Sequence, residues 1–106
     1  MMQVTAWNNG SHHATGAGYG LKLSADDRDL QFDREWNEVI VILPEGERVS
    51  VNINKSSFWS DKCRELISAH IGRWFLSEGL APWPKGKPTK LHLQQVNKNE
   101  FQLIKT

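Results

Sequence analysis

The sequence predicts a single α+β domain over residues 1–106, in which one long amphipathic helix packs on one face of a mainly antiparallel sheet of about six strands. Three observations predict this class. Residues 57–79 carry apolar side chains at helical spacing, short segments of alternating apolar residues lie on both sides of them, and turn-forming residues separate the segments. The expected order along the chain is four strands, the helix and two strands.

Four strands are expected before the helix. Residues 2–8 and 19–23 alternate loosely between apolar and other side chains, and the acidic residues 24–33 that follow predict a loop or one helical turn capped by the first serine. Residues 39–43 form a continuous apolar run, which is typical of a central strand buried on both faces. Residues 49–53 alternate strictly and therefore predict a half-buried strand.

The helix is expected over residues 57–79. Ser57 or Ser60 can cap its start, because a serine side chain accepts a hydrogen bond from a free backbone N–H. Gly79 can end the helix in the left-handed conformation, and Pro82 prevents its continuation. The expected buried stripe follows intervals of three and four residues and consists of Trp59, Cys63, Leu66, Ile67, His70, Ile71, Trp74 and Phe75.

Small residues line the opposite face of the predicted helix. Ser68, Ala69 and Gly72 form a strip along which a second backbone could approach closely, since a glycine presents no Cβ. A solvated helix face tolerates the same residues. Both interpretations of the strip stay open at the level of sequence.

Two strands are expected after the helix. Residues 82–88 contain three prolines, which favour an extended path and exclude regular helix. Apolar residues alternate again over 91–93 and over 101–103, and residues 97–99 predict the hairpin turn between these two strands.

The formal net charge of +1 is unevenly distributed. Residues 1–43 hold three basic and six acidic side chains, a balance of −3, and residues 44–79 hold five of each. Residues 80–106 hold five lysines and one glutamate, a balance of +4. This polarity predicts an oriented electric field and argues against strong nonspecific DNA binding by the whole surface.

Cysteine content and hydropathy bear on the compartment. The single Cys63 excludes an intramolecular disulfide, so a reducing cytoplasm is the expected location. The chain begins with no basic stretch followed by an apolar run, which predicts no signal peptide. The longest apolar run, residues 39–44, is too short to span a bilayer, and no membrane association is expected.

The first candidate site is the glycine-rich segment 9–20. Glycines at alternate positions allow close approach of a ligand, and consecutive free N–H groups can cradle an anion. The segment lacks the lysine of a nucleotide-binding P-loop, and a strand rather than a helix follows it, which excludes a dinucleotide fingerprint. The candidate binding residues are Gly16, Gly18 and Tyr19. The alternative is a mobile loop entering a strand that crosses close to the helix.

The second candidate combines two histidines with an acidic cluster. His12 or His13 together with Asp27 or Asp29 would supply an acid–base pair for catalysis. Adjacent histidines point in different directions in an extended chain, and the acidic spacing lacks the glycine and terminal glutamate of a calcium loop. We therefore expect no metal, and no motif predicts a cofactor.

The third candidate is a basic aromatic loop in the proline-rich stretch. Trp83 lies between two prolines and is followed by Lys85, Lys87 and Lys90. A stiff loop loses little entropy on binding, an exposed tryptophan can stack on a base, and the lysines can contact phosphates. The same tryptophan could anchor a protein partner. Alternatively, Trp83 closes the core at the end of the helix and the lysines are only solvated.

About half of the chain resembles a group of known sequences. The stretches that carry the resemblance are Ser57-Phe58-Trp59 through Cys63, Glu65-Leu66, Ile71-Gly72, Trp74 and Leu80-Ala81-Pro82-Trp83-Pro84-Lys85-Gly86. They resemble uncharacterised small bacterial proteins of the kind carried on mobile gene cassettes. The resemblance implies no activity, substrate or catalytic residue.

Three functions are therefore expected to compete. The first is a nonenzymatic binding module that uses the glycine-rich segment and the Trp83 loop to bind nucleic acid or a protein partner. The second is a small enzyme with a His/Asp pair, which requires the two groups within hydrogen-bond reach in a cleft. The third is a structural homodimer whose partly uncovered sheet is the interface, which requires a large shared apolar patch.

Overall fold

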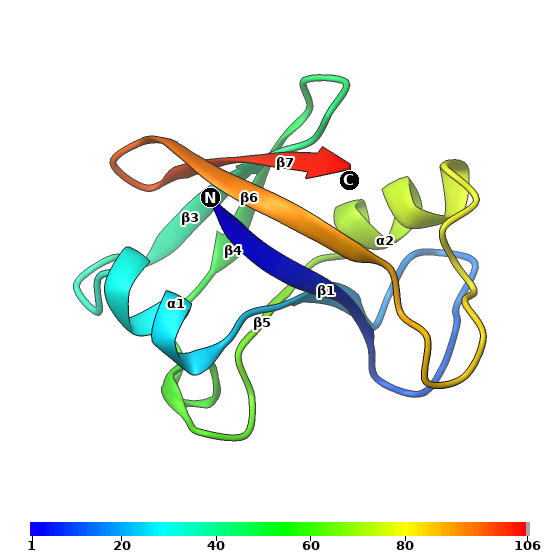
Figure 1. Cartoon of the computed structure of the whole chain (residues 1–106), viewed down its shortest axis with the longest axis horizontal. Coiled ribbons are helices and arrows are strands. Elements are labelled where there is room, and N and C mark those ends of the chain that lie inside the picture. The colour runs from blue at the N-terminus through cyan, green and yellow to red at the C-terminus, as the bar shows by residue number, and fades with distance from the viewer. Residues whose placement is uncertain (106) are drawn as a thin grey trace.

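The computed structural model describes residues 1–105 and consists of one strongly curled sheet with two short helices (Figure 1). The strands are β1 (Met2–Asn8), β2 (Tyr19–Lys22), β3 (Glu38–Ile42), β4 (Arg48–Asn52), β5 (Glu65–Ile67), β6 (Lys90–Asn97) and β7 (Glu100–Lys105). The helices are α1 (Ala25–Gln31), α2 (Ala69–Ser77) and the 3₁₀ turn η1 (Ser56–Trp59). Within this range no helix has the length and apolar character needed to cross a membrane.

The sheet is mixed and nearly closed. Its strand order is β4-β3-β7-β6-β1-β2-β5, in which β3 and β7 run parallel and all other neighbours run antiparallel. The two edge strands, β4 and β5, contact each other, so the sheet approaches a barrel. Figure 1 shows α1 and α2 at opposite ends of the longest axis. The molecule therefore has two distinct ends.

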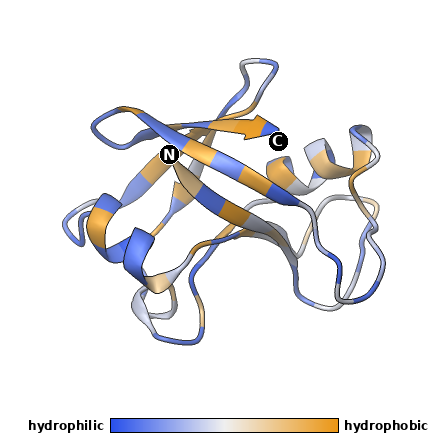
Figure 2. Cartoon of the chain, in the orientation of Figure 1, coloured by the Kyte–Doolittle hydropathy of each residue, from blue (hydrophilic) through white to orange (hydrophobic). Residues whose placement is uncertain are grey.

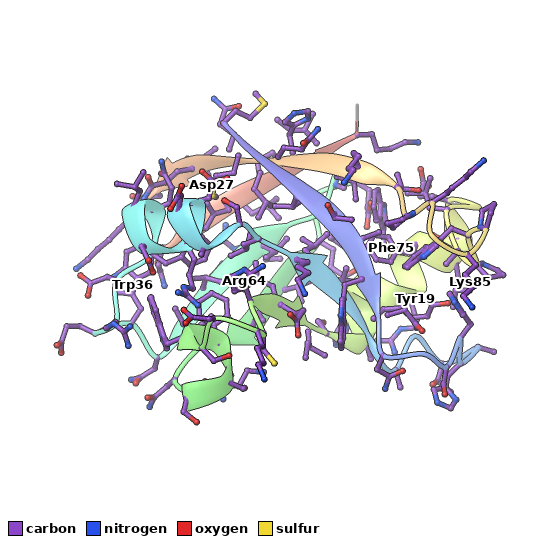
Figure 3. The ribbon with its side chains drawn as sticks, turned by 60° about the horizontal axis from the view of Figure 1, so that its bottom comes forward. Tyr19, Asp27, Trp36, Arg64, Phe75 and Lys85 are labelled. Atoms are coloured by element: carbon purple, nitrogen blue, oxygen red, sulfur yellow. The ribbon has the colours of Figure 1, made fainter. Side chains whose placement is uncertain are left out.

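The core fills the inside of the curled sheet. Orange and blue alternate along β1 and β6 in Figure 2, because successive side chains of a strand point to opposite faces. The largest side chains with almost no exposed surface are the aromatic rings of Tyr19, Phe58, Phe75 and Phe101. Burial of this apolar area drives folding, and it places Tyr19 and Phe75 at the α2 end (Figure 3).

The predicted α+β class and the mainly antiparallel sheet are confirmed, while the strand number and the helix are wrong in detail. The sheet has seven strands, and two short helices replace the long one. Ser24 caps α1 by accepting a hydrogen bond from the N–H of Asp27 at 3.1 Å, as its position before the acidic stretch predicts. The strand over residues 39–43 buries alternate residues only, since Ile40 and Ile42 are half-buried.

The predicted helix over residues 57–79 is wrong, because the chain divides there into η1, β5 and α2. Strand β5 pairs with β2, where Leu66 lies opposite Leu21. Gly20 makes the approach possible, because a Cβ on it would lie 2.5 Å from the Leu66 carbonyl oxygen. The open edge of β2 offers backbone partners to residues 65–67, and this ladder prevails over the local helical spacing.

A buried arginine holds the turn before β5. The Nη1 group of Arg28 donates to the carbonyls of Phe58 at 3.0 Å and Ser60 at 2.6 Å. These bonds tie the 56–60 turn to α1 and turn the chain away from a helical path. Ser60 consequently does not cap a helix, and its hydroxyl accepts from the N–H of Cys63 at 3.0 Å.

The predicted buried stripe holds only in part. Leu66 is buried in β5, and Ile71, Trp74 and Phe75 are buried on α2. Three predictions on the stripe are wrong or weakened: Ile67 is 39% exposed, His70 is exposed beside Glu47, and Cys63 is only half-buried. Ser68 caps α2 instead of Ser57 or Ser60, and its hydroxyl accepts from the N–H of His70 at 3.1 Å.

The predicted end of the helix is confirmed. Gly79 has a φ of +72°, and its N–H donates to Leu76 at 3.2 Å. The N–H of Leu80 donates to the carbonyl of Phe75 at 2.9 Å, so the chain folds back onto the last turn. This pair of bonds is the Schellman motif, and the glycine conformation permits it.

We expect Gly79→Val to cost about 1–3 kcal/mol of folding free energy, because a β-branched residue is strained at positive φ. Nothing lies within 4 Å of a Cβ built at Gly79, so the loss reports the backbone conformation alone. Ser77→Ala is the matched change two residues earlier and should cost about 0.5 kcal/mol, since it removes only the 2.9 Å bond to the Trp74 carbonyl. Urea unfolding of the two variants compares them, and a larger loss for Ser77→Ala would contradict the assignment.

Candidate functional site

A groove of about 520 Å³ lies at the α2 end of the molecule, between the glycine-rich segment and the proline-rich segment. We call it the Trp83 groove. Strand β1 supplies Trp7 and Asn8, the glycine-rich segment supplies His12, and the proline-rich segment supplies Trp83, Lys85 and Pro88. Two segments about seventy residues apart in sequence, which the sequence presents as separate candidates, thus form one surface.

Trp83 forms both part of the groove wall and part of the core edge. Its ring makes edge-to-face contacts with the rings of His12 at 5.4 Å, Tyr19 at 5.7 Å and Phe75 at 6.0 Å between centroids. The side chain is half-buried and packs against the core. Trp83 therefore combines the two expected roles: part of its side chain packs against the core, and part lines the groove.

His12 is held in place by the buried tyrosine below it. The Tyr19 hydroxyl lies 2.5 Å from Nδ1 of the exposed His12. Burial raises the pKa of Tyr19, so its hydroxyl keeps its proton. In the tautomer in which Nδ1 accepts from this hydroxyl, Nε2 carries the ring proton and can donate a hydrogen bond to a ligand in the groove.

The glycine-rich segment packs closely against α2. A Cβ on Gly72 would lie 2.1 Å from the carbonyl oxygen of Gly16, and a Cβ on Gly16 would lie 2.3 Å from that of Ala69. Arg73 adds a hydrogen bond from Nη1 to the carbonyl of Thr15 at 3.2 Å. The small strip on the helix thus receives a second backbone, and the glycines serve this close crossing.

Of the predicted binding residues, three support the groove and do not line it. Gly16 and Tyr19 are buried, and Gly18 turns the chain at a φ of +81°, where an added Cβ would lie 2.7 Å from Asn9 Oδ1. The Gly18 carbonyl accepts a hydrogen bond from the N–H of Asn9 at 2.9 Å. These residues fix the wall that carries His12.

The predicted lysines lie on or near the same end. Lys85 lines the Trp83 groove, and Lys87 is exposed two residues further along. The N–H of Lys87 donates to the Pro84 carbonyl at 2.9 Å, which closes a tight turn at the tip. Lys90 begins β6, is exposed, and donates from Nζ to the Thr5 hydroxyl at 3.1 Å.

The candidate catalytic residues do not come together. His12 contacts Tyr19 at one end of the molecule, whereas Figure 3 shows Asp27 near the opposite end. Asp29 forms an ion pair with Arg28 instead, in which Oδ1 of Asp29 lies 3.0 Å from Nε of Arg28. His13 is exposed on the glycine-rich segment, and over residues 1–105 no group of three or more His, Cys, Asp or Glu side chains could hold a metal ion.

Asn8, which lines the groove beside Trp7, is a residue that the sequence analysis does not identify. Both belong to the end of β1, and Asn8 bends the chain out of the strand, accepting from the N–H of Gly10 at 2.8 Å and donating to the Ser11 carbonyl at 2.8 Å. The Asn-Asn-Gly sequence is a turn signal that could have marked the groove rim. The register of β1 against β2, which sets Trp7 opposite Gly20, comes only from the structure.

Fold and site together define a small α+β protein with a groove of aromatic and basic side chains at one end of a curled sheet. Comparison with models of known families, with curated proteins and with solved structures found no match. The resemblance to proteins of mobile gene cassettes stays a prediction.

Proposed function

We propose that the protein is a nonenzymatic binding module and that its Trp83 groove binds single-stranded nucleic acid. The observation that carries the proposal is the composition of this one groove. It brings two indole rings, an imidazole and a lysine into about 520 Å³, from three separate segments. Aromatic rings that can stack on bases, beside cations that can contact phosphates, are what single-strand binding requires.

The charge distribution supports an anionic ligand at this end. One side of the groove comes from residues 80–90, which hold three lysines and no acidic side chain. Lys85 is on the groove wall, and Lys87 follows on the same exposed turn. A phosphate chain leaving the groove along this turn would meet successive cations, and release of counterions would favour binding.

The shape of the site favours a single strand over a duplex. Stacking on Trp7 or Trp83 needs the face of a base, and in a duplex these faces are covered by neighbouring bases. The prolines on both sides of Trp83 limit the motion of the loop, so ordering it on binding costs little. A groove of this volume is within the range of small-ligand pockets and suits one or two unstacked bases.

The test is filter binding with an oligothymidylate and with a random-sequence duplex at low salt. Trp83→Ala should weaken single-strand binding by about 1–3 kcal/mol, the usual contribution of one stacked base. Lys85→Ala and Lys87→Ala should each reduce the slope of log K against log salt by about 0.7, the value for one phosphate contact of a single strand.

Two further variants separate binding from folding. Trp83→Ala also removes contacts to Tyr19 and Phe75, so its melting curve must be compared with wild type, and Trp83→Phe keeps a ring at that place. Lys98→Ala removes one exposed charge in the β6–β7 turn, away from the groove, and should leave the salt slope unchanged. If folded wild-type protein has no measurable affinity for either nucleic acid, the proposal fails.

A protein partner is the other target that the groove residues suit. Trp83 on a stiff loop is also the kind of anchor found at the centre of protein interfaces. The two targets differ in salt dependence, because a partner anchored by Trp83 would lose affinity on Trp83→Ala and little on Lys85→Ala. The enzyme hypothesis receives no comparable support, since Asp29 pairs with Arg28, and Figure 3 shows Asp27 far from Tyr19, the residue that contacts His12. The homodimer hypothesis stays a prediction.

A further inference from the structure

A second hollow, of about 640 Å³, lies at the α1 end and is unrelated to the Trp83 groove. We call it the Trp59 hollow. Its wall includes the aromatic rings of Phe32, Trp36 and Trp59 and the charged side chains of Asp29, Asp33 and Arg34. Figure 3 places Trp36 at this end, far from Lys85 at the other.

The chain's own arginine already occupies the face of a ring here. The Arg34 guanidinium carbon lies 4.6 Å from the centre of the Trp59 ring, well inside the range of a cation–π contact. Within residues 1–105 Arg34 forms no hydrogen bond and no ion pair, and its side chain is exposed. The ring contact is thus the interaction that positions this guanidinium, and a competing cation can displace it.

Trp59 itself is firmly fixed, unlike Arg34. Its Nε1 donates to the Ile53 carbonyl at 3.0 Å, and its ring packs edge-to-face on Phe58 at 5.1 Å. Arg28 lies 5.6 Å from the same ring but is buried and bonded to Asp29, Phe58 and Ser60. The hollow therefore combines a rigid aromatic surface with one displaceable cation.

The surroundings favour positive charge. The wall has two acidic side chains, Asp29 and Asp33, and Arg34 is its one basic side chain. Arg28 pairs with Asp29, whereas Asp33 forms no ion pair in the described part of the chain. Trp36 adds a buried Nε1 that has no hydrogen-bond partner in the described residues, and a polar group on a ligand can accept a hydrogen bond from it.

We propose that the Trp59 hollow binds a weakly hydrated organic cation, of the class of a quaternary ammonium group or an alkylated lysine side chain, which replaces the Arg34 guanidinium on the Trp59 ring. Such cations lose little hydration on entering a site, and an indole face attracts them most strongly among aromatic rings. Asp33 supplies the compensating charge. The proposal does not depend on the function of the Trp83 groove.

The test is an NMR titration of the tryptophan indole N–H signals with choline at constant ionic strength, against its neutral isostere 3,3-dimethylbutanol. Choline should shift the Trp59 and Trp36 signals, and the neutral alcohol should not. Arg34→Ala vacates the ring and should tighten choline binding about two- to fivefold, the effect of an exposed cation–π contact. Lys87→Ala removes the same charge at the α2 end of the molecule and should tighten choline binding less, since it acts only through the long-range field.

Two further comparisons distinguish a protein side chain from a free small cation as the ligand. A short peptide with trimethyllysine that binds more tightly than choline, and more tightly than the same peptide with plain lysine, supports a protein side chain. Equal binding of choline and peptide supports a free small cation. Equal shifts by choline and the neutral alcohol, or no gain in affinity on Arg34→Ala in a protein that melts like wild type, would overturn the proposal.

Discussion

Leu66→Ala is expected to lower the free energy of unfolding by about 2–5 kcal/mol, whereas Ile67→Ala should lower it by no more than about 1 kcal/mol. Leu66 is completely buried inside the curled sheet, and its neighbour Ile67 is 39% exposed on the other face of β5. Removing buried methylene groups leaves a cavity, while the exposed side chain leaves none. Urea unfolding of the two variants measures both values.

The pair distinguishes a strand from a helix at this place. On the helical stripe both residues would be buried, and the two losses would be similar. In β5 successive side chains point to opposite faces, so the losses must differ. Two similar losses above about 2 kcal/mol would contradict the pairing of β5 with β2.

Gly16→Ala is expected to cost about 2–5 kcal/mol, from two separate sources. Gly16 has a φ of +85°, where an L-residue is strained by about 1–2 kcal/mol. Its added Cβ would also lie 2.3 Å from the Ala69 carbonyl oxygen, and relieving such an overlap typically costs about 1–3 kcal/mol. Thermal and urea unfolding measure the sum.

Two other glycines separate these contributions. Gly10 has a φ of +104° and nothing within 4 Å of an added Cβ, so Gly10→Ala should show the strain alone. Gly72 is helical, so Gly72→Ala carries no such strain and would gain about 1 kcal/mol of helix propensity in an open site. A net loss on Gly72→Ala therefore reports the contact with Gly16. A stabilised Gly72→Ala variant would refute the close crossing.

The crossing also connects stability with the candidate site. The Gly16 segment carries His12, and the Tyr19 hydroxyl below it holds the imidazole at 2.5 Å. Arg73 holds the same segment from α2 through the Thr15 carbonyl. The position of one wall of the Trp83 groove therefore depends on a glycine pair that touches no part of the groove itself.

Local signals in the sequence were sufficient wherever one segment alone decides the structure. The serine before α1, the glycine that ends α2, the alternation over residues 49–53 and the hairpin turn before β7 all appear as predicted. Each rests on interactions within a few residues, such as a cap, a positive φ or a two-residue period. The α+β class follows from the sum of these signals.

Only the tertiary structure decided the secondary structure of residues 57–67 and the set of residues that line the Trp83 groove. The spacing of the apolar residues around Leu66 predicts a helix. The free edge of β2, to which Gly20 permits close approach, selected a strand instead. The Trp83 groove joins Trp7, His12 and Trp83, which strand register and the Gly16–Gly72 crossing bring together from distant parts of the chain. A single sequence carries the residues of these long-range contacts, but which edges and surfaces meet depends on competition between all segments for backbone partners and buried area.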